Sequence, residues 1–231
     1  NRIETVGIDE ASGRVLAEAL VAGLSVPSFN RAAMDGYAVR AKDIFNSDRQ
    51  NPGILKVIGE LNAGETPKST VKDGECIRVA TGAMLPRGAD AVVMVEDVEV
   101  HKGIARVFKA VSTGANISRK GEDIKEGETI LEAGTVLNAG RIGVLAALGL
   151  TKVRVYAKPK VAILSSGEEV AEPGKKLSRG KIYDINSHTI AAVVRANGGT
   201  PVISGVVRDN LEEIKTKIDE ALQSDLVAIS G

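Results

Sequence analysis

Alternating strand-like and helix-like patterns in the last third of the chain constrain the fold most. Residues 161–164, 201–207 and 226–229 are short apolar runs typical of buried strands. Between them lie two amphipathic patterns at helical spacing, whose apolar residues are Ile190, Val193 and Val194 in the first and Leu211, Ile214, Ile218 and Leu222 in the second. The order strand, helix, strand, helix, strand predicts a parallel sheet with right-handed crossovers.

Capping residues place the ends of these two helices. Ser187 is expected to cap the first helix, which ends at Gly198–Gly199, and Asp209 or Asn210 is expected to cap the second. The chain ends at Ser230–Gly231, directly after a strand-like run, and we expect it to be a fragment of a longer protein.

Small, acidic and glycine residues follow each predicted strand of this sheet. Ligands bind to parallel sheets outside the carboxyl ends of the strands. These ends carry Ser165, Ser166, Gly167, Glu168 and Glu169, then Arg208 and Asp209, and finally Ser230 and Gly231. The pattern predicts a binding edge there.

A different pattern, of short β-prone runs separated by glycines, covers residues 54–108. The runs lie at 55–58, 76–80, 91–95 and 105–108. They predict a small barrel or sandwich with no helix of its own.

Two short helices are expected to flank this β-rich region. Asp9 can cap one whose apolar face holds Val15, Leu16, Ala19 and Leu20, and Asn138 can cap another with Ile142, Leu145 and Ala146, closed by Gly149. Their similar size predicts that the two pack together, with Leu16 or Leu20 contacting Leu145.

Two turns near the β-rich region carry acids. In Pro27–Val39, the Asp35–Gly36 pair indicates a tight turn, which Phe29, Met34 and Tyr37 are expected to pin as a loop. Residues 116–123 (NISRKGED) form a second turn, ending in Glu122 and Asp123. We further expect the Thr81 hydroxyl and the Gly82 amide to be left at a strand end, where ligands can bind.

Composition excludes several classes of protein. Lys and Arg total 30, as do Asp and Glu, and this zero net charge argues against a nucleic-acid or anionic-membrane partner. The apolar run at 142–150 is too short to cross a bilayer. Cys76 is the single cysteine, so it makes no internal disulfide, which favours a reducing cytoplasm; it also has no neighbouring histidine to make it a nucleophile.

The acidic turns at Asp35, Asp123, Glu169 and Asp209 suit a hard cation. Oxygen donors without a cysteine and histidine set favour Mg²⁺ over zinc, and Mg²⁺ typically bridges carboxylates to phosphates. His101 and His188 stand isolated. Residue chemistry thus predicts a Mg²⁺-dependent enzyme acting on a phosphorylated or anionic small molecule, held by groups at Thr81, Ser165, Ser166 and Gly167.

Six stretches in unbroken order resemble the molybdopterin molybdenumtransferase (MoeA) family, which includes the C-terminal domain of gephyrin. They are PSFNRAAMDGYAVRAKD at 27–43, RVATGAMLPRGADAVVMVE at 78–96, NISRKGED at 116–123, AGTVLNAGRIGVLAALG at 133–149, PKVAILSSGEEV at 159–170 and GKIYDINS at 180–187. The chain departs from the family pattern at Ala32, Ser118 and Glu168, where Ser, Arg and Asp are usual.

The resemblance implies a mixed α/β and β multidomain fold. Residues 1–44 and 124–158 would form an elongated dimerisation domain, 45–123 an inserted β-rich, barrel-like domain, and 159–231 an incomplete α/β molybdopterin-binding domain. The family's final β domain would be absent from this chain.

The resemblance also implies a reaction and a site. Adenylated molybdopterin, supplied by a molybdopterin adenylyltransferase, would lose AMP and receive metal from molybdate or tungstate with Mg²⁺. The catalytic acids would be Asp35, Asp123, Glu169 and Asp209, of which Glu169 and Asp209 would hold the metal. Substrate would contact Thr81, Gly82, Ser165, Ser166, Gly167, Ser230 and Gly231, and each site would draw on both subunits of a homodimer.

Two alternative functions remain open. A molybdopterin adenylyltransferase shares the α/β part, but it is a single domain without the insert. A gephyrin-like scaffold would use the same fold to bind a receptor peptide without catalysis. The retained acids favour the enzyme.

Overall fold

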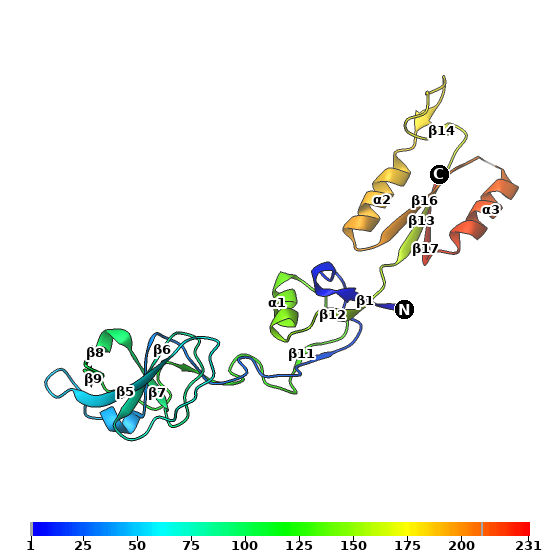
Figure 1. Cartoon of the computed structure of the whole chain (residues 1–231). Coiled ribbons are helices and arrows are strands. Elements are labelled where there is room, and N and C mark those ends of the chain that lie inside the picture. Colours follow the sequence, from blue (N-terminus) through cyan, green and yellow to red (C-terminus); the bar gives the residue numbers. More distant parts are fainter. Residues whose placement is uncertain (1, 209) are drawn as a thin grey trace. The chain divides into compact units, whose positions relative to one another are not determined.

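The protein folds as two compact units in a computed structural model that describes residues 2–208 and 210–231 (Figure 1). One unit comprises residues 20–131, and the other comprises residues 1–19 and 132–231. Each unit is described by itself. Asp209, one of the predicted catalytic and metal-binding acids, lies outside the described residues.

A six-stranded sheet forms the centre of the 20–131 unit. Its strand order is β7–β4–β6–β5–β9–β8. The bounds are β4 Gly36–Val39, β5 Gly53–Leu61, β6 Glu75–Val79, β7 Ala91–Met94, β8 Val98–His101 and β9 Ile104–Val107. Neighbouring strands are antiparallel, except that β5 and β6 run parallel. The predicted β-rich region is therefore confirmed, and its helical content among the described residues is the 3-10 turn η3 (Val95–Asp97).

Both faces of this sheet are covered by apolar side chains. Tyr37 and Val39 pack in one cluster with Leu55 and Val93, whereas Ala38 packs in another on the opposite face. Because side chains alternate along a strand, β4 is buried at every position. The prediction of a loop over Pro27–Val39 is therefore wrong for residues 36–39, which form the central strand β4.

Gly36 is required at the start of β4. A β-carbon there would stand 2.0 Å from the carbonyl oxygen of Val93 on the neighbouring strand. The glycine lets β4 and β7 approach closely, so Asp35 is placed at a fixed entry into the sheet.

Shorter ladders complete this unit. β2 (Leu20–Val21) pairs with β11 (Thr129–Leu131), and β3 (Arg31–Ala32) pairs antiparallel with β10 (Ile117–Ser118). The 3-10 turn η2 (Ala41–Ile44) follows β4.

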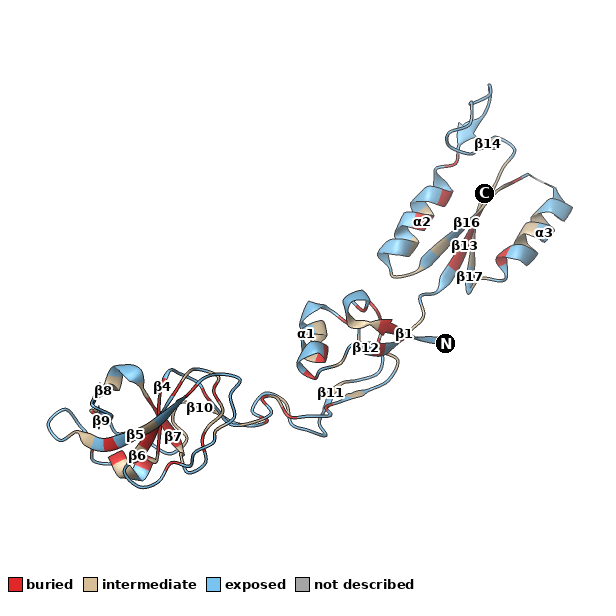
Figure 2. Ribbon diagram, in the orientation of Figure 1, coloured by how far each residue is buried: buried red, intermediate tan, exposed pale blue. Residues whose placement is uncertain are grey.

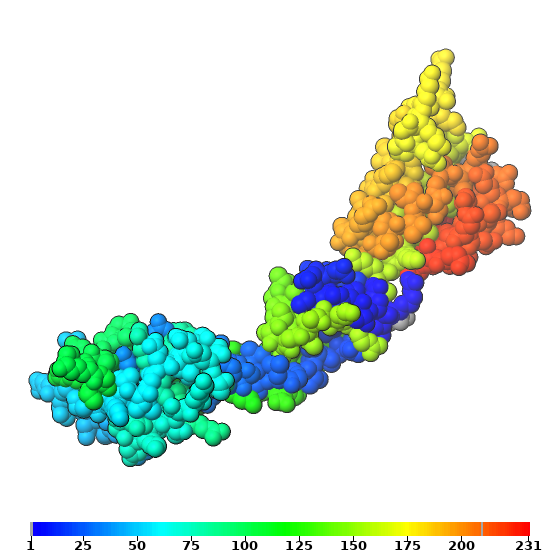
Figure 3. All heavy atoms as spheres, in the orientation of Figure 1, coloured from blue at the N-terminus to red at the C-terminus, as the bar shows by residue number. Residues whose placement is uncertain are grey.

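The other unit begins with an antiparallel ladder of β1 (Ile3–Gly7) and β12 (Lys152–Tyr156). The helix α1 (Ala139–Ala147) is capped by Asn138, whose side chain accepts the Arg141 N–H, as predicted. It packs against the 3-10 turn η1 (Ile8–Glu10). In the space-filling view, the dark-blue N-terminal residues and the green residues around 140–150 form one body (Figure 3).

The predicted helix from Asp9 to Leu20 is wrong. Gly13 has φ +74° and ends the 3-10 turn region, after which the backbone pairs with distant segments. Leu16 N–H donates to Thr135 O, and Val15 and Leu16 form bridges with Val136 and Val155. Tertiary pairing outweighs the helical spacing here. Leu20 belongs to β2 in the other unit, so the predicted packing of two helices is replaced by α1 against η1.

The C-terminal part contains the predicted parallel sheet, in the order β16–β13–β17. The strands are β13 (Lys160–Ser166), β16 (Thr200–Val207) and β17 (Leu226–Ser230), and the helices are α2 (Asn186–Ala196) and α3 (Leu211–Ala221). Burial is concentrated along β13, while the outer faces of both helices are exposed (Figure 2). Two short strands, β14 (Val170–Ala171) and β15 (Ile182–Tyr183), pair beyond the sheet.

The caps and exposed faces of the two helices differ in part from the prediction. Asn210 caps α3, its side chain accepting from Glu212 N and Glu213 N. Ser187 does not cap α2; it lies in the first turn, where its N–H donates to Asp184. Ile190 and Val194 pack on β13 as expected. Of the other predicted apolar residues, Ile214 and Ile218 are half-buried, whereas Val193, Leu211 and Leu222 are exposed.

Among the described residues, none of the helices has the length and apolar character needed to cross a membrane.

Replacing Ile163 with alanine tests the packing of β13. Ile163 is fully buried at the centre of the sheet, so Ile163→Ala should lower the free energy of unfolding of this unit by about 2–4 kcal/mol. Val193→Ala, on the exposed face of α2, should change it by less than about 0.5 kcal/mol. Urea denaturation followed by circular dichroism measures both, and equal losses would contradict the packing described.

Candidate active site

Asp35 and Thr81 form the best-defined polar contact among the predicted site residues. The Thr81 backbone N–H donates to Asp35 Oδ1 at 2.7 Å, and its hydroxyl donates to the same oxygen at 2.6 Å. Asp35 immediately precedes β4, and Thr81 follows β6, which pairs with β4. Two segments more than forty residues apart are thus joined at one end of the sheet.

The two hydrogen bonds keep Asp35 ionised. The Thr81 hydroxyl lowers the pKa of the Asp35 carboxyl most, followed by the Thr81 N–H, with a smaller contribution from the positive charge of Arg78. Oδ2 appears in neither hydrogen bond to Thr81. Asp35 therefore presents an anchored, solvent-exposed carboxylate.

The expectation for Gly82 is wrong in one respect. Its amide is not left for a ligand, because it donates to the carbonyl of Ala32 at 2.8 Å. This bond fixes the turn that carries Thr81 to the end of β3.

Asp123 lies in an exposed turn, as predicted, but apart from Asp35 along the β3–β10 ladder. Asp35 follows β3, and Asp123 follows β10. Because this ladder is antiparallel, the two acids leave it at opposite ends. Asp123 is held near Val26, whose carbonyl accepts the Asp123 N–H at 3.0 Å.

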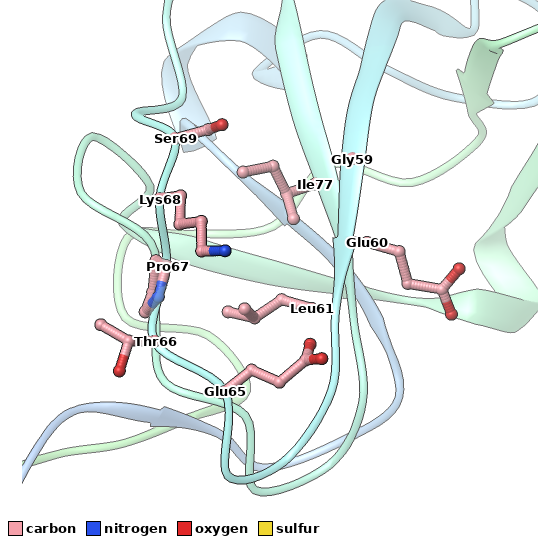
Figure 4. A pocket seen from close by; sticks show the side chains of 9 residues that line it. All are labelled: Gly59, Glu60, Leu61, Glu65, Thr66, Pro67, Lys68, Ser69 and Ile77. Carbon is pink, nitrogen blue, oxygen red and sulfur yellow. The ribbon is translucent and has the colours of Figure 1, made fainter.

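A cavity of about 420 Å³ lies between β5 and the loop that follows it (Figure 4). Residues 59–61 of β5, residues 65–69 of the following loop and Ile77 line it. Lys68 and Glu65 point into it beside the buried Leu61, whereas Glu60 and Thr66 point away. The carbonyl of Leu61, which lines the cavity, accepts the N–H of Ala80, the residue before Thr81.

The parallel sheet brings the carboxyl ends of its strands together. Ser166 pairs in register with Val207, and Ser165 pairs with Ser230. The side chain of Ser166 lies beside Gly231, where a β-carbon would stand 2.8 Å from Ser166 Oγ. The predicted residues Ser166, Ser230 and Gly231 therefore gather at one edge.

Glu169 lies in the turn after β13. Its side chain is exposed, and its carboxylate folds back over Gly167, 2.9 Å from where a β-carbon would stand. The carbonyl of Glu169 accepts the N–H of Ile182. The carboxylate is thus placed at the same edge as Ser166.

Ser165 does not face a ligand, contrary to prediction. Its hydroxyl is buried and donates to Asp184 Oδ1 at 3.0 Å, and it lies 2.8 Å from Ser187 Oγ. The same Asp184 oxygen accepts the Ser187 N–H at 3.0 Å. Burial is the largest single effect on Asp184 and raises its pKa, but the hydrogen bonds from Ser187 and Ser165 together outweigh it and hold the pKa below its ordinary value.

Asp184 and Asn186 are structural residues that the sequence analysis missed. Asn186 Nδ2 donates to Ser230 Oγ at 2.7 Å, so residues 184–187 join the end of β13, the end of β17 and the start of α2. The spacing Asp-x-x-Ser before an apolar helical pattern is the signal that would have pointed to Asp184 as the capping side chain.

The predicted metal site is not assembled by the described residues. In the parts of the chain that the structure describes, no group of three or more His, Cys, Asp and Glu side chains is arranged to hold a metal ion. Glu169 is present at the edge, and its predicted partner Asp209 is outside the described residues.

Cys76 is buried in β6, and burial raises the pKa of its thiol to about 12. A thiol in that state is a poor nucleophile.

Two family models match the chain. The MoeA N-terminal region (domain I and II) matches residues 1–149, and a probable molybdopterin binding domain matches residues 162–231. The chain belongs to the MoeA family. The first match contains Asp35, Thr81 and Asp123, and the second contains Glu169 and the edge of the parallel sheet.

Curated relatives are similar in sequence to almost the whole chain. A protein named molybdopterin molybdenumtransferase from Nostoc sp. is 37% identical over 229 residues, covering 99% of this chain and 52% of the relative. Molybdopterin molybdenumtransferase 2 from Mycobacterium tuberculosis is 37% identical over 228 residues, covering 98% of this chain and 56% of the relative. This MoeA-family chain thus spans about half the length of these curated relatives.

A solved structure of a MoeA protein also matches the chain. The crystal structure of the molybdopterin biosynthesis MoeA protein from Pyrococcus horikoshii aligns with a TM-score of 0.94 and 41% identity. The alignment covers all of this chain and 62% of the solved one. The mixed α/β fold predicted from the resemblance is therefore confirmed.

Replacing Thr81 with valine tests the anchoring of Asp35. Thr81→Val removes the hydroxyl donor but keeps the N–H donor, so the pKa of Asp35 should rise part of the way toward its ordinary value. Carbon-13 NMR titration of the Asp35 carboxyl measures it. Thr66→Val, at a side chain that points away from the neighbouring cavity, should leave the Asp35 titration unchanged. An unmoved pKa in Thr81→Val would contradict the assignment.

Replacing Asp184 with asparagine tests the buried network. Asp184→Asn should cost about 1–3 kcal/mol of unfolding free energy at pH 7, because the hydrogen bonds from Ser165 and Ser187 would then go to a neutral amide oxygen instead of a carboxylate. The folded pKa is lowered, so the carboxylate stabilises the fold above its ordinary pKa of 3.8 and loses that effect as pH falls through the folded value. Urea denaturation at pH 7 and pH 3 should therefore show a difference that shrinks at pH 3. A constant difference would exclude the charged network.

Proposed function

We propose that this chain carries out molybdenum insertion in molybdenum cofactor biosynthesis. Adenylated molybdopterin would be the substrate, molybdate or tungstate the source of metal, and AMP the product. The proposal rests on the anchored carboxylate of Asp35, which lies in the part of the chain matching the MoeA N-terminal region. The relatives named molybdopterin molybdenumtransferase support it.

Each acid has a proposed role. Asp35 has an ionised oxygen held by Thr81 and would position molybdate or the attacking oxygen, together with Asp123. Glu169 would help to hold Mg²⁺ and the phosphate end of the substrate, with Asp209. Mg²⁺, when bound, supplies charge neutralisation at the pyrophosphate.

Groups at the sheet edge would hold the anionic end of the substrate. The Ser166 hydroxyl and the backbone around Gly167 and Gly231 stand at the carboxyl ends of adjacent strands, which is the position where parallel sheets bind ligands. Ser165 would act indirectly, by fixing the end of β13 through Asp184.

The active assembly would be a cytoplasmic homodimer. Asp35 and Thr81 of one subunit would face the α/β part of the other, and a molybdopterin adenylyltransferase would supply the adenylated substrate. A gephyrin-like scaffold is the second candidate function, and it differs from the enzyme by needing neither Asp35 nor Mg²⁺.

Substituting Asp35 tests the enzyme. Asp35→Asn should lower Mg²⁺-dependent AMP release from adenylated molybdopterin by about 100-fold or more, because an amide cannot replace a positioned charge. Asp219→Asn makes the same charge change on exposed α3 and should keep the wild-type rate. Release of AMP is measured with and without Mg²⁺ and molybdate, after circular dichroism shows that both variants fold.

Each result tests a separate part of the proposal. AMP release that is unaffected by removing Mg²⁺ would exclude the proposed metal role. A normal rate in Asp35→Asn would exclude the proposed role of the anchored carboxylate. No AMP release by the folded wild type would reject the enzyme and favour the scaffold.

A further inference from the structure

A second cavity lies at the amino edge of the parallel sheet, away from the proposed catalytic edge. It has a volume of about 610 Å³ and is lined by residues 12–15, 136, 156–159 and 195–198. Pro159 directly precedes β13, and Gly198 lies just before β16. Because β13 has 7 residues, its two ends are roughly 20 Å apart. A ligand here would therefore not overlap one bound beside Ser166.

Positive charge dominates the lining of this cavity. Arg14, Lys158 and Arg195 line it, and none of the described residues that line it is Asp or Glu. Among the described residues, Lys158 and Arg195 take part in no ion pair, whereas Arg14 pairs with Glu4. Two cations are therefore without a protein counter-ion at the cavity wall.

Arg14 offers further donors. It is buried, and its Nη2 group donates to Glu4 and to the carbonyl of Tyr156. A guanidinium has five N–H donors, so those on Nη1 and Nε remain without a partner in the described part of the chain. In that part of the chain, every fully buried side-chain nitrogen has a hydrogen-bond partner. The Nη1 and Nε groups of Arg14 are therefore accessible, and Arg14 lines this cavity.

The end of α2 at the cavity does not cancel this charge. The C-terminus of a helix is partly negative because its last carbonyls are unpaired. Here Val193 O accepts from the backbone and side chain of Asn197, Arg195 O from Gly198 N, and Val194 O from Gly199 N. The last turn is thus largely satisfied within the protein.

The cavity has room for more than an inorganic ion. Its volume falls within the range typical of small-molecule sites. Val15, Val136 and Ala157 supply apolar wall beside the charged groups. Guanidinium groups bind phosphate oxygens in pairs, and lysine adds a point charge. A small organic phosphate fits both the charge and the size.

We propose that this cavity is a binding site for a small organic phosphate, formed by Arg14, Lys158 and Arg195 and separate from the proposed catalytic edge. The site does not depend on Mg²⁺, since no acid lines it. This proposal goes beyond the proposed function, and it depends only on the cavity and the residues that line it.

Binding of inorganic pyrophosphate, used as a probe in EDTA, tests the site by isothermal titration calorimetry. The double variant Lys158→Ala/Arg195→Ala should bind about tenfold more weakly or worse than the wild type. Both side chains are exposed, so the fold should be retained. Arg14 is left intact, because its bond to Tyr156 O holds the cavity wall.

Two matched variants complete the experiment. Lys152→Ala/Lys215→Ala removes two exposed charges from the same unit and should bind pyrophosphate nearly as the wild type does. Ser166→Ala removes a hydroxyl that is proposed to hold the anion at the catalytic edge, and it should leave pyrophosphate binding at this cavity unchanged, which separates the two places. The proposal is overturned if wild type does not bind pyrophosphate, if the two double variants weaken binding equally, or if Ser166→Ala weakens it as much as the cavity variant.

Discussion

The two hydrogen bonds from Thr81 to one oxygen of Asp35 are the constraint on which the candidate site depends. They join the ends of the neighbouring strands β4 and β6, and Gly36 separately lets β4 approach β7 closely. An exposed aspartate would otherwise sample many positions and titrate normally. Anchored in this way, it is a pre-organised negative group, which is the property that catalysis by charge positioning needs.

The edge of the parallel sheet depends on a buried network. Asp184 accepts hydrogen bonds from Ser165 and Ser187, and Asn186 donates to Ser230, so the ends of β13 and β17 are held against the start of α2. These hydrogen bonds therefore fix the backbone at the edge that carries Ser166 and Glu169. Polar residues near a site can thus serve its geometry without touching a ligand.

Much of the fold was predictable because local pattern and tertiary structure agree. The parallel sheet, α1 and the strands of the β-rich region follow from apolar periodicity and caps such as Asn138. The region around Leu16 failed because its apolar residues have helical spacing, yet its backbone pairs with residues 135–136 and 154–155. Pairing over that sequence distance leaves no local signal.

The site was predictable in its residues but not in their roles. The acidic turns and strand ends are visible in sequence, and the resemblance selected Asp35, Asp123 and Glu169 among them. Ser165 and Ser187 were assigned wrongly, because a hydroxyl at a strand end or helix start reads the same whether it faces a ligand or a buried carboxylate. Only the structure shows that Asp184 accepts the Ser165 hydroxyl and the Ser187 backbone N–H, and that the two hydroxyls lie beside each other.

We propose that Asp35 and Glu169 serve one site shared between two subunits. Mixing the inactive variants Asp35→Asn and Glu169→Gln under conditions that exchange subunits tests it most directly. Molybdate-dependent AMP release should recover to about a quarter of the wild-type rate, because half of randomly formed symmetric dimers are mixed and each of those regains one intact site. No recovery, with mixed dimers demonstrated by mass spectrometry, would contradict the shared site.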